Sequence, residues 1–152
     1  LKEGGGDDIM NLVWKEGQEG SGTHLDLEFL LEQDPDTIFI IGGGKSNSNA
    51  DGFRMGYNVT EDEFLESTKG MVEARPGYDQ LQAVKNNQIY CIDDGVLRTL
   101  RDYCVVEYIA KNLYPDEFQD LDPEADIKAF TEKYLPSLPQ EGIFFHQYSY
   151  ED

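Results

Sequence analysis

One stretch of the chain limits its possible folds more than any other. Residues 25–44 read LDLEFLLEQDPDTIFIIGGG. Apolar residues recur at helical spacing in the first part, Pro35 prevents the helix from continuing, and the apolar run Thr37–Ile41 is typical of a strand covered on both faces. Glycines follow directly, at the sheet edge where open α/β sheets usually bind ligands. This order predicts an α/β fold with a mostly parallel central sheet flanked by helices.

A second block repeats the same layout. Residues 75–91 read RPGYDQLQAVKNNQIYC, which predicts a short helix over 78–84, a polar turn and a strand over 88–92. Further helices are expected over 96–113 and from Asp122–Pro123 onward, the latter ending before Pro136. Thr60 with Glu63 forms a capping box for a helix over 60–71. The tail, residues 142–150, adds an edge strand or wraps the core. With 152 residues, the chain is long enough for one domain with a hydrophobic core.

The composition excludes some classes of function. The net charge of -19 argues against nucleic-acid binding, because phosphate contacts need clustered Lys and Arg. Most of the acid is expected to form a solvated surface, with a cationic partner or a salty medium as the alternative. No apolar run reaches membrane-spanning length. Cys91 and Cys104 lack the spacing of a metal or redox motif; buried free thiols are favoured over a disulfide.

Catalytic motifs are absent from the sequence. The run Gly42–Ser46 invites a P-loop interpretation, but a P-loop needs glycine five residues before Gly44, and Phe39 stands there. The two histidines lie in no HxxxH or HxH spacing, and no GxSxG element occurs. We therefore expect no enzyme activity, no protein-built metal site and no cofactor.

Several residues are candidates for ligand binding, each with a structural alternative. His24 lines a cleft or is a plain surface residue. Arg98 and Arg101 lie in the first turns of the helix expected over 96–113, where a positive charge is unfavourable next to the helix dipole. Their placement suggests that they bind an anionic ligand; the alternative is that they form salt bridges with nearby acidic residues. The aromatic and cationic cluster after the glycines suits a large, flat or anionic ligand, or its aromatic residues pin the loop to the core; its members are Phe53, Arg54, Met55 and Tyr57.

Three segments resemble one known family, in the right order. LEFLLEQDPDTIFI and RPGYDQLQAVKNNQIYCID resemble two motifs of the C-terminal lobe of ABC-transporter substrate-binding proteins for iron–siderophore, haem and cobalamin (periplasmic binding proteins of class III). YPDEFQDLDPEADIKAFTEKYLP is similar to the family's closing helix. The resemblance divides the chain into a linker stub with a short helix and loop (1–24), the C-terminal, Rossmann-like three-layer lobe (25–136) and a tail packing on that lobe (137–152).

The resemblance also implies a function and a set of site residues. The protein would capture a metal chelate of siderophore, haem or cobalamin type between two lobes, outside the cytoplasmic membrane, and deliver it to an ABC permease. The first lobe would be missing here, and the full-length protein would be membrane-anchored. Glu28 matches the family's permease-docking glutamate. Ligand contacts would fall on three loops, at Thr23 and His24, at Gly43, Gly44 and Lys45, and at Gly95–Arg98.

Two features depart from the family pattern, and two rival functions remain open. The insertion Ser46–Tyr57 is longer than usual, and Gly22 lies near the place where some members have a tryptophan. The rivals are a stand-alone extracellular interaction domain and a Rossmann-like enzyme domain, although the enzyme lacks its GxGxxG fingerprint after the first strand.

Overall fold

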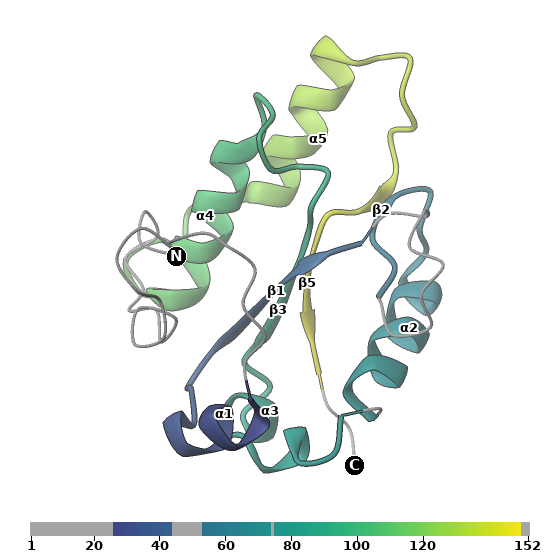
Figure 1. Cartoon of the computed structure of the whole chain (residues 1–152). Coiled ribbons are helices and arrows are strands. Elements are labelled where there is room, and N and C mark those ends of the chain that lie inside the picture. The colour runs from purple at the N-terminus through teal and green to yellow at the C-terminus, as the bar shows by residue number, and fades with distance from the viewer. Residues whose placement is uncertain (1–25, 44–52, 74, 150–152) are drawn as a thin grey trace, which may run out of the picture.

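The computed structural model describes residues 26–43, 53–73 and 75–149 (Figure 1). The elements in chain order are α1 (Leu27–Gln33), β1 (Ile38–Gly42), β2 (Gly56–Tyr57), α2 (Glu61–Glu73), the 3₁₀ helix η3 (Tyr78–Gln80), α3 (Gln82–Lys85), β3 (Ile89–Asp93), α4 (Asp102–Leu113), α5 (Pro123–Tyr134), β4 (Gly142–Ile143) and β5 (Phe145–Tyr148). The short helix expected within residues 1–24 lies outside the described ranges. Within those ranges, no helix combines the length and the apolar character needed to cross a membrane.

The central sheet has the strand order β1-β3-β5. β1 and β3 pair in parallel, with Ile38 opposite Ile89 and Gly42 opposite Asp93, as the two repeated blocks predict. The tail forms β5, which pairs antiparallel with β3, so the edge-strand alternative for the tail is confirmed. In the described residues the sheet is therefore mixed, with one parallel and one antiparallel pair of strands. The antiparallel pair arises because the chain runs back along β3 after α5. The tail also contributes β4, which pairs antiparallel with β2.

Helices cover both faces of the sheet and make three layers (Figure 1). β3 is buried along its whole length, and its side chains alternate between the two faces. Cys91 packs in a cluster with side chains of α2 and α3, and Ile92 packs in a second cluster with those of α4 and α5. The α/β layered fold expected from the sequence is confirmed.

The two cysteines lie in different clusters. Cys91 belongs to the cluster on the α2 and α3 face, and Cys104 belongs to the one on the α4 and α5 face. Both are buried and free, which confirms the expectation of free thiols over a disulfide. Burial raises the pKa of Cys91 to about 12, so its reactive thiolate form is disfavoured at neutral pH.

The prediction of a helix over 96–113 was wrong about where the helix begins. α4 begins only at Asp102, and Arg101 is its N-cap residue. Residues before it form turns, in which Thr99 Oγ1 donates to Val96 O at 2.7 Å and accepts from the Arg101 amide at 3.1 Å. Arg98 has φ 59°, a left-handed conformation that a right-handed helix cannot contain. The helix was predicted to start too early because the spacing of apolar residues continues through the turn. That spacing gives no sign of the local hydrogen bonds at Thr99 that replace helix there.

The helix expected over 78–84 is two short pieces instead of one. Leu81 is extended (φ -69°, ψ 142°) and separates η3 from α3. The amide of Gln82 then donates to Asp34 Oδ1 at 2.8 Å, so a side chain from the turn after α1 supplies the bond that begins α3. This partner lies 48 residues away in the sequence and is not visible in the local pattern.

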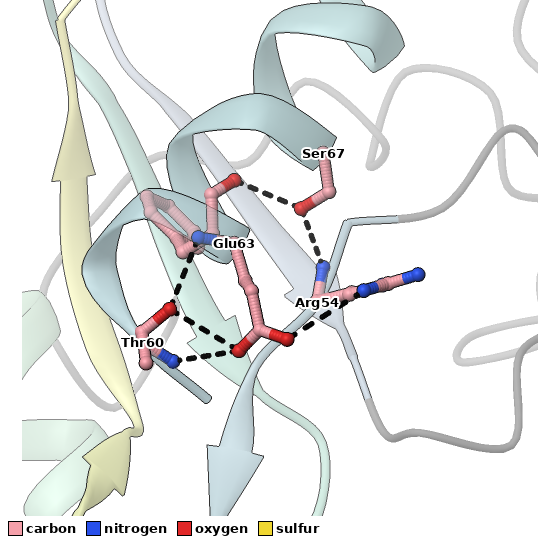
Figure 2. A network of polar contacts seen from close by, with 5 residues as sticks. Arg54, Thr60, Glu63 and Ser67 are labelled. Carbon is pink, nitrogen blue, oxygen red and sulfur yellow. Dashed lines mark hydrogen bonds and ion pairs between the residues drawn. The ribbon is translucent and has the colours of Figure 1, made fainter. Parts of the chain in front are cut away.

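The capping box at the start of α2 is confirmed (Figure 2). The Thr60 amide donates to Glu63 Oε2 at 3.0 Å, and the Glu63 amide donates to Thr60 Oγ1 at 3.3 Å. Both partners lie within one helical turn, which is why the sequence alone could identify them.

Candidate functional site

The candidate site lies where β1 and β3 end side by side. Gly42 and Asp93 are paired as the last residues of the two parallel strands, and the Asp94 amide donates to Gly42 O at 2.8 Å. Gly43 follows β1 and the turn 94–101 follows β3. This is the carboxyl edge of the parallel pair, which the sequence analysis named as the place for a ligand.

Gly43 allows three segments to meet at this edge. Its φ is 103°, which favours glycine. A Cβ at this position would lie 2.9 Å from Met55 Cβ and 3.2 Å from Asp93 Oδ1. The chain after β1, the segment before β2 and the end of β3 therefore pack with no space for a side chain at Gly43.

Asp93 is a buried carboxylate at the centre of this packing. Its side chain lies beside a glycine from β2 and another from its own turn, since a Cβ on Gly56 would be 3.4 Å from Asp93 Oδ1 and one on Gly95 would be 2.9 Å from Oδ2. Burial raises the pKa of Asp93 to about 6; the hydrogen bond from the Gly95 backbone and the charge of Arg101 lower it, while the neighbouring Asp94 raises it. The carboxyl group thus takes up its proton close to neutral pH.

Arg101 is buried and bonded within the protein. Its Nη1 donates to the Tyr57 hydroxyl at 2.6 Å, and its Nη2 donates to Gly95 O at 3.2 Å. The guanidinium carbon lies 5.7 Å from the Tyr57 ring centre and 5.9 Å from that of Phe144. The two rings meet edge to face at 4.8 Å. These three side chains, Tyr57, Arg101 and Phe144, are called the arginine clamp below.

The turn between β3 and α4 directs other side chains outward. Arg98 is exposed, and Leu100 is 83% exposed, the highest exposure among the large apolar residues described. Ile41, near the end of β1, is 50% exposed. The edge thus offers one cation together with apolar surface, beside a buried acid.

Phe53 and Arg54 lie near this edge but make contacts of their own. Phe53 is buried in the cluster beneath α2 and meets Phe64 edge to face at 6.5 Å. The Arg54 amide donates to Ser67 Oγ at 2.8 Å, and its guanidinium lies 3.8 Å from Glu63 Oε1 (Figure 2). For Phe53, the contacts favour the alternative in which it pins the loop to the core.

The remaining predicted site residues lie elsewhere or outside the described ranges. Glu28 is exposed on α1, where Asp26 caps the helix by accepting from the Glu28 amide at 3.1 Å. α1 lies beside α3, away from the end of β1 that carries the site (Figure 1). Thr23, His24, Gly44 and Lys45 lie outside the residues that the structure describes.

Sequence reasoning missed two residues of the edge. Asp93 was seen only as part of a strand-end loop, although an acid ending an apolar strand is a usable signal for a site. Phe144 gave no signal, because only the return of the tail along β3 brings it to Tyr57 and Arg101.

A second hollow lies away from the strand ends. A groove of about 700 Å³ separates α5 from the β4–β5 tail and has Ile127, Thr131 and Phe145 among its lining residues. Among the described residues, no group of three or more His, Cys, Asp or Glu side chains could hold a metal ion.

Comparison with known proteins gives a likeness among solved structures. No protein-family model matches the chain, and a search of curated proteins gave no match. Among solved structures, the chain is similar to the TroA-like periplasmic binding protein FepB from Veillonella parvula, with 36% identity and a TM-score of 0.77. The match covers 87% of this chain and 38% of that protein.

This likeness supports the assignment to the periplasmic binding proteins that the three sequence segments suggested. It agrees with the chain being one lobe, since the chain spans well under half of the similar protein. The similar protein is of a class of non-enzymatic transport components, in line with the expectation that this chain is not an enzyme.

Proposed function

We propose that this chain is the C-terminal lobe of a periplasmic binding protein, which captures a solute outside the cytoplasmic membrane for an ABC importer. The observation that supports this most is the likeness to a TroA-like periplasmic binding protein over 87% of the chain. The carboxyl edge of β1 and β3 would then be one wall of the cleft, and the missing first lobe would supply the other. A lipid anchor in the full-length protein belongs to the same proposal.

The edge suggests the chemistry of the solute. Arg98 offers an exposed cation, and Leu100 and Ile41 offer apolar surface beside it. This combination suits an anionic chelate with apolar faces, which favours an iron–siderophore or haem over the uncharged cobalamin among the ligands of the resemblance. We propose Arg98 as a contact and Gly43, which is buried, as the residue that lets the edge close beneath it. Thr23, His24, Gly44 and Lys45 remain predicted contacts. Arg54, Tyr57 and Arg101 stay candidates, but their described contacts are within the protein.

Replacing Arg98 with alanine is expected to weaken binding of an anionic chelate in the full-length protein by about 10- to 100-fold, the usual effect of losing a hydrogen bond to a charged group. Intrinsic fluorescence titrations with a ferric tricatecholate, ferric citrate, haemin and cyanocobalamin would measure this. Arg75→Ala is a matched control, because it removes the same charge near η3, at the other end of the sheet. Equal affinities for wild type and Arg98→Ala would exclude Arg98 as a contact.

The same titrations distinguish the proposed binding protein from its two alternatives, a Rossmann-like enzyme domain and a stand-alone interaction domain. A binding protein leaves its ligand unchanged, whereas conversion of a probe would favour the enzyme domain. Absence of binding by the two-lobed protein to every probe would favour the stand-alone interaction domain.

Replacing Glu28 with alanine is expected to reduce uptake by about ten-fold while leaving ligand affinity unchanged. We propose that this exposed carboxylate on α1 docks onto cationic residues of the permease, where such charges mainly orient and speed association. Transport into cells or proteoliposomes provides the measurement. Glu132→Ala, an exposed acid on α5, is the control with the same charge change. Normal uptake by the Glu28 variant would remove the docking role.

A further inference from the structure

Three segments far apart in the sequence meet at the arginine clamp. Tyr57 comes from β2, Arg101 is the N-cap residue of α4, and Phe144 lies between β4 and β5. Tyr57 and Arg101 are 44 positions apart. The tail also holds β2 directly, because β2 pairs with β4 and the Asn58 amide donates to Glu141 O at 3.0 Å.

Arg101 closes the turn from which Arg98 and Leu100 project. Its Nη2 donates back across the turn to Gly95 O. Four amides inside or next to the turn are bonded locally: Val96 to Asp93 O, Leu97 to Asp94 O, Arg101 to Thr99 Oγ1 and Asp102 to Thr99 O. These local bonds hold a left-handed Arg98, a conformation that non-glycine residues adopt at a cost and that persists only when its surroundings fix it.

We infer that the arginine clamp is a positioning device: the C-terminal tail and β2 hold the turn 94–101 through Arg101, so that Arg98 and Leu100 face the cleft in one arrangement. The inference deepens the proposed function and rests on it for the role of Arg98 toward a ligand. The guanidinium is turned toward the protein, since Nη1 and Nη2 each donate to a partner within it and the residue is only 7% exposed. Its charge therefore acts on the turn, and Arg98 carries the charge that faces outward.

The experiment uses the full-length protein with Tyr57→Phe, which removes the hydroxyl bonded to Arg101 and keeps the ring. Phe144→Leu tests the tail, and Tyr134→Phe is the matched control, because it removes an exposed hydroxyl on α5. Hydrogen exchange is measured at the amides of Val96, Leu97, Arg101 and Asp102. We expect exchange about ten-fold faster or more in both clamp variants, and no change in the control, because a hydrogen bond to a charged group is lost or weakened.

A double-mutant cycle then tests positioning as distinct from general stability. Tyr57→Phe should weaken binding of the chelate probe that wild type binds best by about five-fold or more. That effect should vanish in an Arg98→Ala background, since the clamp acts through Arg98. Unchanged exchange in the turn would overturn the inference. Faster exchange with unchanged affinity, or with an affinity loss that persists without Arg98, would also overturn it. If no probe binds wild type, the proposed function fails, and exchange alone decides whether the clamp holds the turn.

Discussion

Replacing Gly43 with alanine is expected to lower the free energy of unfolding by about 2–4 kcal/mol, because strained backbone and overpacking each cost about 1–3 kcal/mol. The φ of 103° disfavours any side chain, and the new methyl would lie 2.9 Å from Met55 Cβ. Urea denaturation followed by circular dichroism would measure the loss. The methyl would also separate the end of β1 from Asp93, so binding at this edge should weaken with stability.

Gly70→Ala is the control, and its expected effect on the free energy of unfolding has the opposite sign. Gly70 lies inside α2, where a Cβ would meet nothing within 4 Å. Alanine there is expected to raise the free energy of unfolding by up to about 1 kcal/mol, since glycine is the poorer helix former. If the two substitutions changed stability by similar amounts, the close packing of three segments at Gly43 would be refuted.

Replacing Asp93 with asparagine is expected to stabilise the protein at pH 7. The folded-state pKa is raised from 3.8 to about 6, chiefly by burial, so the folded protein favours the protonated acid. The carboxyl's contribution to stability is therefore fully favourable below pH 4 and is lost as the pH rises toward and through 6. A shift of this size corresponds to a gain of up to about 3 kcal/mol for the neutral amide at pH 7.

The measurement for Asp93 is the difference in unfolding free energy between variant and wild type from pH 4 to pH 7. The difference should be near zero at pH 4 and grow with pH, which separates this group from the other carboxylates in the chain. Asp94→Asn is the control, because its side chain is exposed and only raises the pKa of its neighbour. A difference that is constant across this range would contradict the raised pKa.

A stabilising effect of Asp93→Asn would bear on the proposed function of this edge. It would mean that a buried acid costs stability at neutral pH at the place where the ends of β1 and β3 meet β2. Residues that serve binding often lower stability, so such a cost would agree with the binding role proposed for this edge. In this case, the charge of Asp93 lies behind the turn that carries Arg98.

The local features of the fold were readable from the sequence. The capping box of Thr60 and Glu63 was identified because its partners lie within one turn of helix. The parallel pairing of β1 and β3 followed from two repeated blocks of helix, turn and strand. The start of α4 was misplaced because a bonded turn at Thr99 replaces helix where the apolar spacing continues.

The amino-acid sequence alone predicted α1, β1, α2, β3 and α5 and the glycine-marked edge, because each depends on residues within a few turns of helix or within one strand of one another. Only the tertiary structure decided that Arg101 bonds Tyr57 and leaves Arg98 outward, and that Asp93 is buried. The physical reason is distance along the chain. The clamp forms only when the tail returns antiparallel along β3 and brings Phe144 to residues from two other segments, and no periodic pattern encodes that return.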